Sequence, residues 1–105
     1  MKFFTIVFVL LLANMSHAGW SASGTVSAVT SHNGFHLIAT DIADGMCGQM
    51  GKFYWRTDDP DAKDMFSIAL AAFISAKSIA VVYNSESAEC ILTNFTQASH
   101  ISIKN

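Results

Sequence analysis

The sequence is poor in charge, in proline and in cysteine. Charged residues make up 13% of its 105 positions, and 8 Asp and Glu residues outnumber 6 Lys and Arg residues. No basic stripe is present, which argues against nucleic acid or an anionic membrane surface as the main partner. A glycine-rich phosphate loop and a Ser or Cys nucleophile with a recognisable base beside it are also missing. We therefore expect no enzyme, no catalytic residues and no cofactor, and keep a small hydrolase only as a formal alternative.

The beginning of the chain is typical of a secretory signal peptide. Lys2 supplies a basic start, and the apolar run behind it is too short to span a membrane stably. The run ends in the small-residue pattern Ser-His-Ala at Ala18. We therefore expect residues 1–18 to be a signal peptide cleaved after Ala18, and residues 19–105 to form one secreted or periplasmic domain.

The two cysteines, Cys47 and Cys90, are predicted to form a disulfide. Export would place them in an oxidising compartment, where such a pair usually joins. By loop-closure entropy alone, this bond would stabilise the fold by about 4 kcal/mol. No Cys-x-x-Cys motif and no histidine cluster accompanies the cysteines, so a structural role is favoured over a redox or metal role.

The stretch MFSIALAAFISAKSIAVVY, residues 65–83, is about as long as a membrane-spanning helix. Its chemistry changes at Lys77, where a helical pattern of apolar residues gives way to a β-branched run. A span here would also place Cys47 and Cys90 on opposite sides of the membrane. We therefore expect no membrane span, but a helix end and a strand that meet near Lys77.

Other local patterns predict further strands. Asn33-Gly34 supplies the two positive-φ residues of a tight hairpin turn between strands at 24–30 and 35–40. The aromatic-rich segment 52–57 predicts a third strand, and the C-terminal segment contains one or two more, of which HISIK alternates best. With a helix between the third and fourth strands, this is the element order of a small antiparallel OB-fold barrel of about five strands.

The segment DDPDAKD has the residues of a helix start, with Asp59 as N-cap and Pro60 at the first helical position. The neighbouring acidic residues suit the positive end of the helix and lack the spacing of a calcium loop. His32 and His36 have no third ligand in view, so we expect no metal site.

The predicted helix has two different faces. Its predicted core stripe consists of Ala62, Met65, Phe66, Ala69, Ala72, Phe73 and Ala76. Beyond the first turn, the opposite face carries no charge, although a face that only meets water usually does. We therefore predict an oligomer face there, made of Ser67, Ile68, Ala71, Ile74 and Ser75.

A family pattern runs along nearly the whole mature chain. It consists of Trp20, the first hairpin, Cys47 in the loop after it, a helix that leads into an aliphatic strand ending in Tyr83, and the late Cys90. In this order of elements the chain resembles the binding subunits of subtilase cytotoxin and pertussis-like toxins, and small secreted bacterial proteins related to them. It is shorter than those subunits between the helix and the final strand.

The resemblance implies an OB barrel whose five copies form a ring that binds cell-surface glycans and accompanies an enzymatic subunit. Toxin subunits carry a glycan-reading serine in the first strand, and Ser23, Thr25 and Ser27 are the alternatives in this sequence. Together with aromatic residues suited to sugar stacking, this defines five candidate ligand-binding residues: Trp20, Ser23, Thr25, Phe35 and Tyr83.

The resulting prediction is a secreted, non-enzymatic protein that recognises a glycan or a partner protein as a pentameric ring. The alternative is a stand-alone protein of the same fold that binds an envelope component or inhibits an enzyme, without a toxin partner.

Overall fold

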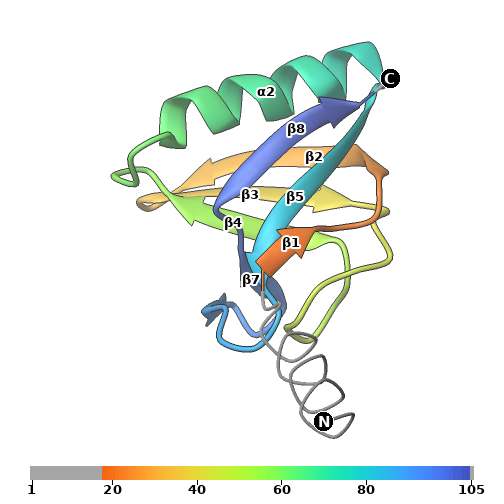
Figure 1. Cartoon of the computed structure of the whole chain (residues 1–105). Coiled ribbons are helices and arrows are strands. Elements are labelled where there is room, and N and C mark those ends of the chain that lie inside the picture. The colour runs from red at the N-terminus through yellow and green to blue at the C-terminus, as the bar shows by residue number, and fades with distance from the viewer. Residues whose placement is uncertain (1–17, 105) are drawn as a thin grey trace, which may run out of the picture.

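The computed structural model describes residues 18–104, so the predicted signal peptide, apart from Ala18, lies outside the described residues. Within them, eight strands form a sheet that curls into a half-barrel, and helix α2 packs along it (Figure 1). The elements are β1 (Ala18–Trp20), β2 (Gly24–His32), β3 (Phe35–Thr40), β4 (Lys52–Arg56), α2 (Ala62–Ser75), β5 (Ser78–Asn84), β6 (Cys90–Ile91), β7 (Phe95–Gln97) and β8 (His100–Lys104). A mainly β protein with a helix after the predicted third strand is therefore confirmed.

The predicted hairpin forms at the expected turn. Asn33 and Gly34 have φ angles of 53° and 88°, as a two-residue hairpin turn requires. His32 pairs with Phe35 directly beside the turn, and the ladder continues along β2 and β3.

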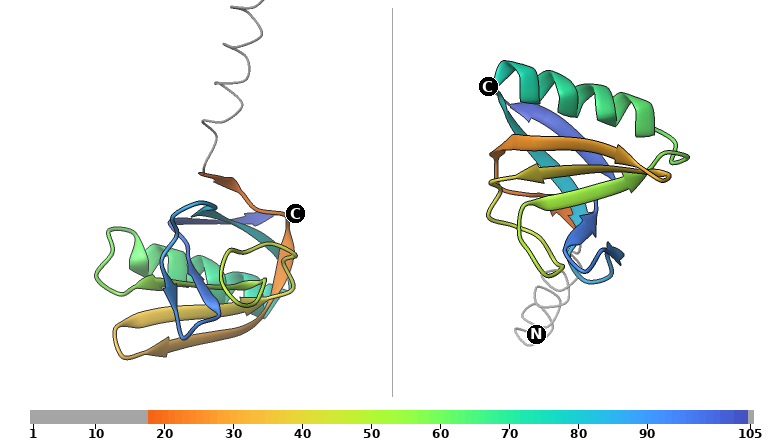
Figure 2. Two further views of the ribbon diagram at one scale, coloured as in Figure 1. Left: turned by 90° about the horizontal axis from the view of Figure 1, so that it is seen from below. Right: turned by 180° about the vertical axis from the view of Figure 1, so that it is seen from behind.

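The sheet curls because its last strands pair with strands on opposite sides of the strand order. β7 pairs in parallel with β4, whereas β8 pairs antiparallel with β5. Between them, the N–H of Ala98 donates to the carbonyl of Tyr54 (2.8 Å), and the N–H of Ser99 donates to the carbonyl of Val82 (2.9 Å). Consecutive residues thus bond to β4 and to β5, and Figure 2 shows this segment joining the two parts of the sheet.

Strand β1 was not predicted from the sequence. It pairs antiparallel with β5, with Ala18 opposite Asn84 and Trp20 opposite Val82. Three residues are too few to show the alternation of apolar and polar side chains that is typical of a strand. Strand β1 is therefore recognised only from its backbone pairing with β5.

The helix begins later than predicted. Asp59 is not its N-cap, because the Asp59 carboxylate accepts the backbone N–H of Arg56 (3.0 Å) and its carbonyl accepts that of Ala62 (3.1 Å). Residues 59–61 therefore form a turn ahead of the helix. At the other end Ala76 adopts a left-handed conformation, so the predicted change from helix to strand near Lys77 is confirmed. Among residues 18–104, no helix is long and apolar enough to cross a membrane.

The buried stripe of the helix is rotated from its predicted position. Ala62, Met65, Ala69 and Ala72 are buried as predicted, but Phe73 is 45% exposed and Ala76 lies exposed just beyond the helix, so the prediction was wrong for these two. Ile68, predicted on the outer face, instead packs partly buried against the core. The buried face of the helix thus consists of three alanines and Met65, with Phe66 and Ile68 packed partly buried beside them.

A disulfide joins Cys47 to Cys90, as predicted. Beside it, the fully buried hydroxyl of Thr96 accepts the backbone N–H groups of Met46 and Cys47, each at 3.1 Å. The bond and this hydroxyl fasten the loop after β3 to the hairpin formed by β6 and β7.

We expect Thr96→Val to destabilise the protein by about 1–3 kcal/mol, because two backbone N–H groups would lose the buried hydroxyl that accepts them. Urea denaturation with the disulfide intact measures the change. Thr96→Ser keeps the acceptor and should lose much less, and Thr30→Val on the exposed surface of β2 serves as the control. Equal stability of Thr96→Val and Thr30→Val would contradict this role.

His36 lies between the helix and the sheet. Its ring stacks on Phe66 of α2 (centroids 4.2 Å apart) and lies tilted beside Trp55 of β4 (5.9 Å). Its buried Nδ1 has no hydrogen-bond partner among the described residues. Burial lowers the pKa of His36 from its ordinary value of 6.5, because the charged form is poorly solvated there.

As the pH falls through 6.5, the unfolded chain therefore binds more protons at His36 than the folded protein does. The free energy of unfolding decreases as the pH is lowered. We expect His36→Phe to reduce this loss, measured as Tm between neutral and mildly acidic pH. His32→Gln, at the exposed end of β2, is the control. If His36→Phe follows the wild-type pH profile, His36 does not cause the loss.

Candidate functional site

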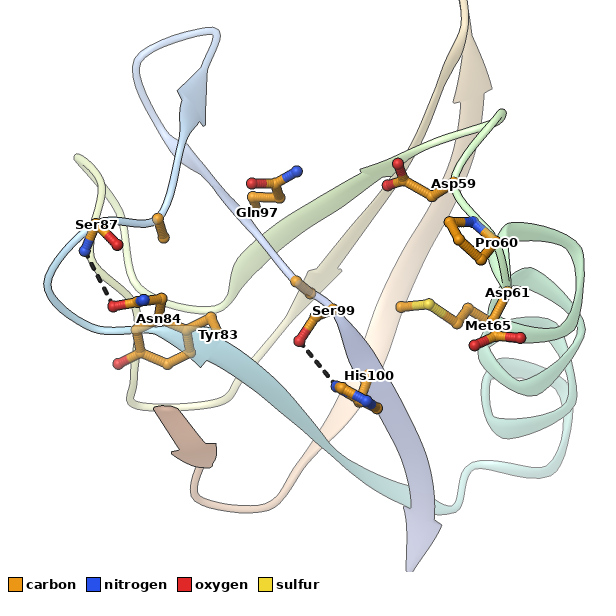
Figure 3. Close-up of a pocket in the computed structure, with 12 residues that line it drawn as sticks. Asp59, Pro60, Asp61, Met65, Tyr83, Asn84, Ser87, Gln97, Ser99 and His100 are labelled. Atoms are coloured by element: carbon orange, nitrogen blue, oxygen red, sulfur yellow. Dashed lines mark hydrogen bonds between the residues drawn. The ribbon is translucent and has the colours of Figure 1, made fainter. Parts of the chain in front are cut away.

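An open cleft of about 680 Å³ lies between the start of α2 and the ends of β5 and β7. Figure 3 shows the helix start on one side, the end of β5 on the other, and the segment from β7 to β8 between them. The lining residues are Asp59, Pro60, Asp61, Met65, Tyr83, Asn84, Ser87, Ala88, Gln97, Ala98, Ser99 and His100.

One wall is formed by the end of β5 and the turn that follows it. The side-chain oxygen of Asn84 accepts the backbone N–H groups of Glu86 (3.0 Å) and Ser87 (3.1 Å). These bonds fold the turn back, so that Ser87 and Ala88 line the cleft beside Asn84 (Figure 3).

Tyr83 on the same wall contacts two residues that do not line the cleft, Asp44 and Phe53. Its hydroxyl donates a hydrogen bond to the Asp44 carboxylate, and its ring lies 5.9 Å from that of Phe53. Burial, followed by the bond to this carboxylate, raises the pKa of Tyr83. The phenol therefore stays protonated, and its ring is a fixed surface rather than a proton-transfer group.

The floor of the cleft leads to an exposed tryptophan. The Ser99 hydroxyl lies 2.8 Å from His100 Nδ1, as Figure 3 shows, and the His100 ring meets Trp20 edge-on at a centroid distance of 6.3 Å. Trp20 is 53% exposed, and the Lys104 ammonium lies 5.5 Å from the centre of its ring. Trp20 and His100 stand in register on either side of Val82, so strand pairing sets their positions.

The opposite wall is acidic. Asp59 and Asp61 lie in the turn before the helix, next to Pro60, and Met65 follows on the first turn. Asp61 occupies the N-cap position, yet its side chain makes no capping hydrogen bond. Its carboxylate is therefore not used to close the helix end.

Two of the five predicted ligand-binding residues lie in this region. Tyr83 lines the cleft, and Trp20 contacts the lining residue His100. Thr25 instead bonds to Asp41 through both its backbone N–H and its hydroxyl.

The other two predicted residues are not part of the cleft lining either. Ser23 is exposed before β2. Phe35 lies at the start of β3, packed edge-on against Tyr54 with the Arg56 guanidinium over its ring. Ser23, Thr25 and Phe35 therefore lie outside the lining of this cleft.

Sequence reasoning missed Asn84, Gln97, Ser99 and His100 as site residues. The alternating HISIK pattern placed His100 on a strand, but nothing local showed that this strand begins beside Trp20. Among residues 18–104, no group of three or more His, Cys, Asp or Glu side chains could hold a metal ion. His36 is stacked on the helix, while His32 is exposed.

Comparison with known proteins found no matching protein-family model, no matching curated protein and no matching solved structure.

Proposed function

We propose that the chain is an exported, non-enzymatic binding protein that recognises a glycan across the cleft and the exposed face of Trp20. The observation that carries this proposal is that His100 both lines the cleft and contacts the Trp20 ring. Through it, an aromatic surface and a polar hollow form one continuous region.

This combination suits a sugar. Saccharide rings have apolar faces that pack on aromatic rings and hydroxyl groups that need hydrogen-bond partners. The cleft offers the amides of Asn84 and Gln97 and the hydroxyls of Ser87 and Ser99. Its volume falls in the range of small-ligand sites, which fix orientation through a few well-placed polar groups.

We also propose that the curled sheet is an OB-type barrel, as the resemblance to toxin binding subunits implies. β7 pairs in parallel with β4, and β8 pairs antiparallel with β5. These pairings support a barrel in which β7 and β8 act as one bent strand that links the two sides of the sheet. The place of α2 between β4 and β5 supports the same order.

The outer face of α2 supports a ring-like assembly with other copies, as in the toxin subunits. Of the predicted oligomer face, Ser67, Ala71, Ile74 and Ser75 are exposed, and Ile74 is 81% exposed. The neighbouring Leu70 (37%) and Phe73 (45%) enlarge this apolar surface.

A partner enzymatic subunit would belong to the same proposal. A stand-alone protein that binds an envelope component or inhibits an enzyme is the alternative.

We expect Trp20→Ala to weaken glycan binding by about tenfold, or about 1.4 kcal/mol, because the stacking surface is lost. A glycan array identifies the ligand, and calorimetry with that glycan measures the change. Leu92→Ala removes another exposed apolar side chain away from the cleft and should bind like wild type. A wild-type protein that binds no glycan on the array would overturn the proposal and favour the alternative.

We expect the mature protein to associate at micromolar concentrations and Ile74→Lys to shift it toward monomer, because a charge would be placed in the apolar contact. Light scattering measures both masses. Met50→Lys changes an exposed apolar residue in a loop outside the helix and should leave the mass unchanged. A monomeric wild-type protein would disprove self-association.

A further inference from the structure

The charges around the cleft are unevenly distributed. Its helix-side wall carries the carboxylates of Asp59 and Asp61. Among the described residues that line the cleft, none is a lysine or an arginine. The acidic groups of the lining are therefore these two carboxylates, its one basic group is the His100 imidazole, and the Lys104 ammonium lies outside it, over Trp20.

Both carboxylates retain acceptor capacity toward the cleft. Asp59 accepts one hydrogen bond through Oδ2, from the backbone N–H of Arg56. Asp61 makes no capping bond with its side chain. Since an ionised carboxylate has about four acceptor sites, each can take further donors from a ligand. The Arg56 guanidinium is paired with Glu89 instead of with these acids, and Lys63, two residues after Asp61, is not part of the cleft lining.

The remaining wall is neutral and rich in hydrogen-bonding groups. Asn84, Ser87, Gln97 and Ser99 provide amides and hydroxyls, while Pro60 and Met65 add apolar surface beside the acids. A ligand of this cleft therefore meets neutral polar groups and the His100 imidazole on one side, and the two carboxylates on the other.

From this arrangement we propose that the cleft selects saccharides that carry free amino groups, such as glucosamine oligomers, over their N-acetylated or acidic counterparts. The inference rests on the proposed glycan-binding function and adds the charge of the ligand to it. A protonated amine donates charge-assisted hydrogen bonds to Asp59 and Asp61. An acetamide has a single N–H and no charge, and a carboxylated sugar would be repelled by the same wall.

The test compares matched tetrasaccharides on the folded mature protein. The glucosamine tetramer, the N-acetylglucosamine tetramer and a glucuronate-containing tetramer are titrated by calorimetry, at a mildly acidic pH at which glucosamine amines are protonated. We expect the glucosamine tetramer to bind at least about fivefold more tightly than either of the others, and its affinity to fall with added salt.

Variants separate the acidic wall from general effects of charge. Asp61→Asn and Asp59→Asn keep an acceptor oxygen but remove the charge, so each should reduce the preference for the glucosamine tetramer by about fivefold or more. The matched control is Asp58→Asn, an exposed acid in the same turn that does not line the cleft, and it should leave the preference unchanged. Unchanged Tm values show that the turn remains folded.

The outcomes distinguish this inference from the proposed function. If no saccharide binds, in the titrations or on the glycan array, the glycan-binding function itself fails. If the N-acetylated or acidic tetramer binds as well as the glucosamine tetramer, glycan binding stands but the amine preference is overturned. A preference that survives in both Asp59→Asn and Asp61→Asn would likewise overturn it, because the wall would then not be its cause.

Discussion

The arrangement of this protein depends on two consecutive backbone bonds. The N–H of Ala98 reaches Tyr54 on β4, and the N–H of Ser99 reaches Val82 on β5. Ala98 is buried, so its N–H cannot leave the carbonyl of Tyr54 without a cost in free energy, and the bond from Ser99 holds the next residue on β5. Because this segment is held on both sides, the sheet must curl. The same bonds place Gln97, Ser99 and His100 in the floor of the cleft.

The helix start determines the opposite side of the cleft. Had the helix begun at Asp59, that carboxylate would have capped it, as the sequence pattern suggests. It instead bonds back to Arg56, and the helix begins at Ala62. The turn leaves Asp59 and Asp61 facing the cleft, so that a feature normally used for helix stability supplies the charge of the candidate site.

Local signals in the sequence were enough for much of the fold. The Asn33-Gly34 turn and the change from helix to strand near Lys77 depend on neighbouring residues, and both are present. Strand β1 and the parallel pairing of β4 with β7 depend on contacts between distant segments, which local periodicity does not show. The same limit explains the site. Trp20 and Tyr83 were recognisable as aromatic candidates, whereas the link through His100 exists only once β1, β5 and β8 are aligned.

The pairing of Ala18 with Asn84 places the predicted signal-peptide cleavage site within strand β1. A peptidase must hold the residues around its scissile bond in its own active site, separate from any sheet. If the leader is removed between Ala18 and Gly19, that bond lies inside a strand already paired in the folded protein. Cleavage would therefore have to precede the docking of β1, and Trp20 would take its place beside His100 only afterwards. Removal of the leader would then act as a timing step for completing the candidate binding surface.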